Sequence, residues 1–168
     1  MNQRVGGAWD APWRVLDQVL GMLLLLMVTL TVGLVVARYL FGVGSIATQE
    51  AVLWLHSTVF LLGSASALRA DKHVRVDVLL ARWSPRTRAL VDCLGMLVFL
   101  LPFAGFMLVG SLEYVAASWS LREASREPGG LPAVYLLKTL IPTAAVLLGL
   151  QGLLRAWRSW RLFRGADA

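Results

Sequence analysis

The chain has 168 residues, enough for one domain and too few for two sizeable ones. Hydrophobic residues make up 58% of it and charged residues 15%, whereas soluble domains average about 45–50% apolar and about 25% charged residues. This composition excludes a soluble enzyme and predicts an integral membrane protein. The net charge of +6 does not indicate nucleic acid binding, because the basic residues lie between and after long apolar runs instead of forming a separate domain.

Four apolar runs are long enough to cross a bilayer, since a helix needs about 20 residues to traverse ~30 Å of hydrocarbon. The sequence therefore predicts an all-α integral membrane fold with four transmembrane helices in a single membrane domain. We expect Ser84 and Pro85 to be the N-cap and first turn of the third helix, and Pro132 to lie in the first turn of the fourth. The expected spans are residues 16–37, 51–68, 88–112 and 132–154.

The connections between the runs differ in character. Gly42 and Gly44 in the first predict a tight hairpin, and the Pro-Gly-Gly sequence that begins at Pro128 predicts a turn in the last. The second connection carries apolar residues at helical spacing, which predicts a short amphipathic helix in the membrane interface. These apolar residues are Val76, Leu79, Leu80 and Trp83.

Basic residues are distributed unequally between the two sides of the membrane. Twelve lie on the side shared by the N-terminal segment, the second connection and the C-terminal tail, and four lie on the other side. By the positive-inside rule, both termini are expected in the cytoplasm. The N-terminal segment shows no cleavage site for a signal peptide, so we expect the first run to be a membrane span.

No residue pattern predicts a catalytic or cofactor site. His56 lies inside the second span, but a bundle haem needs a second facing histidine, and His73 lies in a connection. Two histidines and one cysteine make no metal site at usable spacing. We therefore expect no catalytic, substrate-binding or metal site and no cofactor. The alternatives are an electron-carrier subunit of the cytochrome type and a stand-alone small exporter.

The positions of the acidic residues bear on whether the chain itself carries a solute. They lie at span edges, whereas a carrier places polar or charged groups at mid-membrane. The edge residues are Asp17, Glu50, Asp92 and Glu113. The one charge well inside a span is Lys138, about 9 Å along the helix from Pro132. It either extends to the interface or pairs with a carboxylate of this chain, such as Glu50, or of a partner subunit.

Small residues at four-residue spacing predict close helix packing, either within the chain or against a partner. The three stripes are Thr29, Gly33 and Ala37; Gly63 and Ala67; and Ala145 and Gly149.

Several short strings occur in an order that matches a known family. The strongest is His-Val-Arg-Val-Asp at residues 73–77, directly after the second span. The others are Arg38-Tyr39, Gln49-Glu50, Gly63, Ala67-Leu68-Arg69, Ser118-Trp119, Glu123-Ala124-Ser125, Pro132, Lys138 to Pro142, and Gln151-Gly152. With these strings the chain resembles the small membrane subunit of tripartite ATP-independent periplasmic (TRAP) transporters, the DctQ-like family.

The resemblance implies a role and a set of partners. Such a subunit pairs, in the bacterial inner membrane, with a large multi-span permease subunit that carries the substrate and sodium sites, and a periplasmic binding protein delivers the solute. The small subunit would brace the large one and help to dock the binding protein, for uptake of an organic acid or related solute. The residues expected at interfaces or in structural contacts are Arg38, Glu50, Arg69, His73, Arg75, Asp77, Glu123, Ser125, Lys138 and Gln151.

Overall fold

The computed structural model describes residues 10–70 and 83–165, and all of its regular structure is helical. The helices are α1 (Asp10–Phe41), α2 (Ile46–Arg69), α4 (Pro85–Gly95), the π-helical turn η1 (Met96–Leu100), α5 (Leu101–Ser120) and α6 (Val134–Phe163). α4, η1 and α5 run on as one helix, so four helices in the described part are long and apolar enough to cross a membrane. The predicted fold class is confirmed, while the expected amphipathic helix lies outside the described residues.

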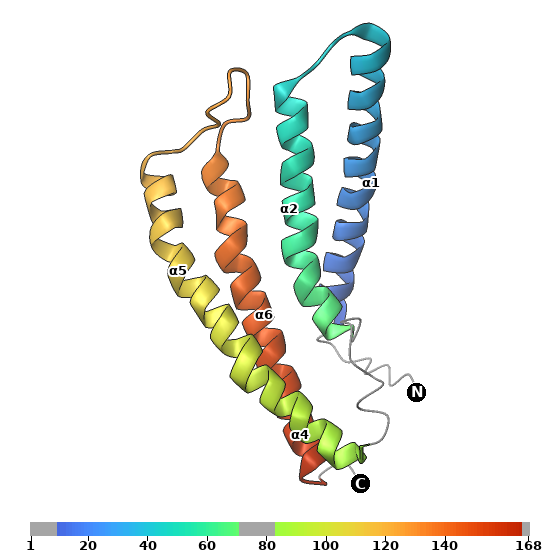
Figure 1. Cartoon of the computed structure of the whole chain (residues 1–168), viewed down its shortest axis with the longest axis vertical. Coiled ribbons are helices and arrows are strands. Elements are labelled where there is room, and N and C mark those ends of the chain that lie inside the picture. Colours follow the sequence, from blue (N-terminus) through green and yellow to red (C-terminus); the bar gives the residue numbers. More distant parts are fainter. Residues whose placement is uncertain (1–9, 71–82, 166–168) are drawn as a thin grey trace.

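The helices form two hairpins that lie side by side (Figure 1). α1 and α2 make one hairpin, α5 and α6 make the other, and α2 packs against both α1 and α6. We call the end that carries the connections 42–45 and 121–133 the loop end. The opposite end, where α1 begins and α6 finishes, is the terminal end.

The helix starts follow from local sequence. The Ser45 hydroxyl caps α2 and the Ser84 hydroxyl caps α4, each accepting a backbone N–H three residues later at 3.2 Å. The expected roles of Ser84 and Pro85 are confirmed. α6, however, begins at Val134 and not at Pro132, because Ala133 has a left-handed backbone (φ 71°) that separates the turn from the helix.

Small residues pack α6 against its neighbours. Ala144 and Ala145 are 0% and 2% exposed, and a Cβ built on Gly149 would lie 3.9 Å from Ala104. Such residues allow close approach where packing drives helix association in lipid. By contrast, a Cβ built on Gly33 in α1 would meet no other atom within 4 Å.

The π-helical turn lies where the third membrane helix contacts Gly152 of α6. Pro102 follows this turn and has no N–H to donate, which accounts for the local departure from α-helical bonding. A Cβ on Gly152 would lie 2.8 Å from Cδ2 of Leu100 in the turn. Glycine at position 152 therefore lets α6 pack directly against η1.

Candidate functional site

A carboxylate of α2 holds the connection between α5 and α6 at the loop end. Glu50 accepts hydrogen bonds from the Ser125 hydroxyl and, at 2.6 Å, from the backbone N–H of Leu131. Ser125 and Leu131 are themselves joined, because the Ser125 N–H donates to the Leu131 carbonyl at 3.1 Å. The Glu50 side chain of the first helical hairpin thus holds both sides of a turn in the second hairpin.

Glycine is required where the turn passes Glu50. A Cβ built on Gly130 would lie 2.6 Å from Cβ of Ser125 and 2.8 Å from Oε1 of Glu50. Both distances are shorter than real Cβ contacts, and Cβ of Ser125 is fixed to the backbone. A side chain at position 130 therefore requires the turn to move away from α2.

A second carboxylate, Glu123, joins the same connection to α5 and α6. It pairs with the ammonium of Lys138 and accepts a hydrogen bond from the Ser118 hydroxyl at 2.6 Å. These two donors, Lys138 first, lower the pKa of Glu123 below its usual value. The Lys138 Nζ also lies 4.0 Å from the centre of the Tyr114 ring.

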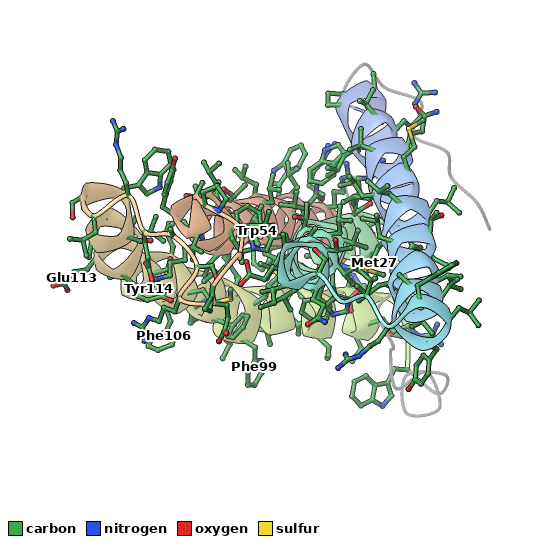
Figure 2. All side chains as sticks on the ribbon, turned by 90° about the horizontal axis from the view of Figure 1, so that it is seen from above. Met27, Trp54, Phe99, Phe106, Glu113 and Tyr114 are labelled. Atoms are coloured by element: carbon green, nitrogen blue, oxygen red, sulfur yellow. The ribbon has the colours of Figure 1, made fainter. Side chains whose placement is uncertain are left out.

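We call Glu50, Ser118, Glu123, Ser125 and Lys138 the loop-end cluster. It is reinforced by the Trp119 indole, which donates to the Thr139 hydroxyl at 2.9 Å. Figure 2, seen from the loop end, shows Glu113 pointing outward from α5, away from α6 and α2. Phe99 and Phe106 also point outward there and are 75% and 77% exposed, as lipid-facing side chains would be.

Another set of polar contacts joins the helices at the terminal end. Asp17 of α1 pairs with Arg69 of α2 at 3.0 Å and accepts the Ser66 hydroxyl. Arg155 of α6 donates to the Leu68 carbonyl at 3.1 Å and lies 3.8 Å from the Asp92 carboxylate of α4. Each hairpin is therefore tied to the other at both ends of the bundle.

Comparison with known proteins agrees with this architecture. The family model described as "Tripartite ATP-independent periplasmic transporters, DctQ component" matches residues 10–162, nearly the whole chain. The chain belongs to the DctQ family. A search of curated proteins gave no match.

Membership of the DctQ family makes this protein a small permease subunit of a TRAP transporter, carrying four helices of membrane-spanning length. A tripartite transporter of this family implies a large permease subunit and a substrate-binding protein as its partners. As a DctQ component, the chain is part of a transporter and sits in the inner membrane as a multi-pass protein.

The structure brings together four of the ten residues singled out from the sequence of this DctQ-family subunit: Glu50, Glu123, Ser125 and Lys138. Arg69 lies at the terminal end, paired with Asp17. Gln151 is 5% exposed, and its Nε2 group has no hydrogen-bond partner among the described residues. Arg38 is exposed in the last turn of α1. The remaining three, His73, Arg75 and Asp77, lie outside the described residues.

The partner of Lys138 differs from those considered from the sequence. Its carboxylate is Glu123 in the connecting loop, whereas Glu50 bonds to the loop through Ser125 and Leu131, and Glu113 points outward. Counting residues along a span estimates the membrane depth of span residues only. It gives no depth for a loop residue such as Glu123, so the sequence did not indicate this partner.

Three residues that contribute to these contacts, Asp17, Ser118 and Gly130, were not predicted as functional residues from the sequence. The pairing of Asp17 with Arg69 had a signal, since both lie at span edges on the same side of the membrane. Ser118 and Gly130 had none beyond a family string and a turn signal, because their roles depend on contacts made across the fold.

Proposed function

We propose that this subunit braces the large permease subunit in the membrane and helps to dock the periplasmic substrate-binding protein at its loop end. The transporter would take up an organic acid or related solute, driven by a sodium gradient. In this arrangement both termini lie in the cytoplasm and the loop end faces the periplasm. The excess of basic residues at the terminal end supports this orientation.

The observation that carries the docking role is the fixed shape of the connection 121–133. Glu50 holds it to α2, and Glu123 holds it to α6 through Lys138. A loop of this length would lose conformational entropy on binding a partner, and anchoring it beforehand reduces that cost. The contacts therefore support a preformed binding surface.

Charged side chains project from this fixed loop. Arg122, Arg126 and Glu127 are exposed, while the charges of Glu50 and Glu123 are engaged in the contacts that anchor it. Exposed charges at the rim of an interface steer encounter and fix orientation. We infer that the two arginines meet carboxylates on the binding protein.

The bracing role rests on what the spans contain. Lys138 lies one turn inside α6, and Glu123 compensates its charge near the loop end. Other polar contacts join helix to helix, as Asp17 with Arg69 and Arg155 with Leu68 do. Such contacts hold helix against helix in the described part of the chain and do not place charge at mid-membrane, where a carrier would.

Reconstitution in liposomes tests the bracing role. Three preparations are compared under a sodium gradient with the cognate binding protein: this subunit alone, the large subunit alone, and both. Uptake is expected only with both. Transport by this subunit alone would refute the brace, and full activity of the large subunit alone would reduce this chain to a stabiliser of expression.

Binding of the cognate binding protein to the purified pair of membrane subunits tests the docking role. The double variant Arg122→Gln/Arg126→Gln should weaken binding by about threefold to thirtyfold, because exposed ion pairs are individually weak. Arg158→Gln/Arg164→Gln removes the same charge at the terminal end and should leave the affinity unchanged. Equal affinities for the two double variants would exclude the loop arginines from the interface.

A further inference from the structure

A strongly basic surface projects from the terminal end of the bundle. We call residues 83–92 of the α4 side and 155–165 of the α6 side the foot. Figure 1 shows these parts of α4 and α6 running past the ends of α1 and α2. The foot carries six arginines and a single carboxylate, Asp92, which already lies 3.8 Å from Arg155. The arginines are Arg86, Arg88, Arg155, Arg158, Arg161 and Arg164.

The length of α6 places this charge at the depth of lipid phosphates. The helix has 30 residues and is therefore about 45 Å long, against ~30 Å of hydrocarbon and ~40–45 Å including both headgroup layers. The part from Arg155 to Phe163 extends about 13 Å beyond the last uncharged run, at ~1.5 Å per residue. A headgroup layer is roughly 5–8 Å thick, so Arg155 and Arg158 reach the phosphates and Arg161 lies just beyond.

One guanidinium is held across the gap between the two helices. Arg86 of α4 donates from Nε to the Phe163 carbonyl of α6 at 3.2 Å, and its Cζ lies 6.0 Å from the centre of the Phe163 ring. Its two Nη groups make no hydrogen bond within the described part of the chain. Arg158 and Arg164 are exposed and likewise make no side-chain hydrogen bond there. Several N–H donors of the foot therefore have no acceptor among the described residues.

Exposed aromatic rings accompany these arginines. Trp157 and Trp160 are 57% and 44% exposed, and Trp160 packs on Phe163 with ring centres 5.7 Å apart. Tryptophan side chains favour the boundary between hydrocarbon and headgroups. Such rings place the foot at the boundary of the lipid, which binding to a soluble macromolecule would not require.

We propose that the foot binds the phosphate of an anionic phospholipid between α4 and α6. The fork of an arginine matches phosphate oxygens, and basic surfaces between helix ends bind anionic headgroups. A lipid with a net negative charge is selected over a zwitterionic one because Asp92 is the only carboxylate among the described foot residues. The acyl chains would lie along the exposed rings of Trp157 and Trp160.

Native mass spectrometry of the detergent-purified full chain tests this, with phosphatidylglycerol as the probe and phosphatidylcholine as the zwitterionic reference. The variant Arg86→Gln/Arg158→Gln/Arg164→Gln should bind phosphatidylglycerol at least about tenfold more weakly than wild type, as expected for loss of charge-assisted hydrogen bonds. The matched control Arg38→Gln/Arg122→Gln/Arg126→Gln removes the same charge at the loop end and should bind as wild type does. Neither variant should change the weak binding of phosphatidylcholine.

The outcomes distinguish a lipid phosphate from a free phosphate ion and from nucleic acid as the ligand of the foot. Equal phosphatidylglycerol affinity in the two triple variants would overturn the proposal, and so would equal affinity of wild type for the two lipids. Competition by inorganic phosphate at the same concentration as the lipid would assign the site to a free anion, and tighter binding of a short RNA would assign it to nucleic acid. Should the triple variant fail to fold, Arg158→Gln/Arg164→Gln removes side chains that make no hydrogen bond among the described residues, and it should still weaken lipid binding severalfold.

Discussion

Substitution of Gly130 by alanine should release the connection between α5 and α6 from α2. The added Cβ would lie 2.6 Å from Cβ of Ser125, whereas ordinary contacts are 3.4–4 Å, so the turn must move by about 1 Å. The hydrogen bond from Leu131 N–H to Glu50, now 2.6 Å, would lengthen to roughly 3.6 Å, which is no longer a hydrogen bond. The connection 121–133 would therefore no longer be held to α2 by this hydrogen bond.

The cost of this substitution follows from overpacking. Inserting a methyl group where neighbours cannot yield destabilises by about 1–3 kcal/mol. At about 2–4 °C per kcal/mol for a chain of this size, the midpoint of thermal unfolding should fall by roughly 2–12 °C. Gly44→Ala is the matched control, because a Cβ there meets nothing within 4 Å at the same end of the bundle.

Two measurements check this prediction on the purified pair of membrane subunits. Tryptophan fluorescence on heating gives the unfolding midpoint, and hydrogen exchange with mass spectrometry reports on residues 121–133. Gly130→Ala should lower the midpoint and speed exchange in that loop, while Gly44→Ala should change neither. The reasoning is refuted if both variants keep the wild-type midpoint and the wild-type loop protection.

Three further predictions concern orientation and charge. A cysteine at Pro128 should react with an impermeant reagent outside spheroplasts and one at Gly165 should not; labelling of only the tail would reverse the topology. Lys138→Ala should reduce recovery of the complex with the large subunit more than Arg122→Ala, because Lys138 is paired and Arg122 is exposed, and equal recovery would contradict this. Because the folded pKa of Glu123 is lowered, its stabilisation is complete above the ordinary value of 4.5 and is lost as pH falls through the lowered value. The difference in unfolding midpoint between wild type and Glu123→Gln should therefore hold steady from about pH 8 to about pH 5 and shrink in more acid solution, whereas a difference that grows on acidification would contradict the pairing.

The helices themselves were predictable because the bilayer imposes a simple rule. A run such as residues 18–37 has no charged residue, and a helix satisfies its backbone hydrogen bonds within that one segment in hydrocarbon. The cap at Ser84 was equally predictable from local sequence, because a serine directly before a first-turn proline can accept the backbone N–H three residues later. The start of α6 was misplaced by two residues because Pro132 suits a first turn, whereas Ala133 has a left-handed backbone that ends the preceding turn.

Four of the ten expected residues meet in the loop-end cluster, but the way they meet was beyond the sequence. Composition and spacing identify Glu50 and Lys138 as polar groups near one membrane surface. Hydropathy is a property of one segment and therefore does not indicate contacts between segments. Which donor reaches which carboxylate depends on how the two hairpins pack, and that packing joins residues as distant as Glu50 and Leu131. The sequence by itself therefore determined the class, the four membrane helices and the family. Only the tertiary structure decided that Glu50 holds the loop and Glu123 neutralises Lys138, because hydrogen bonds require positions in space that no local pattern specifies.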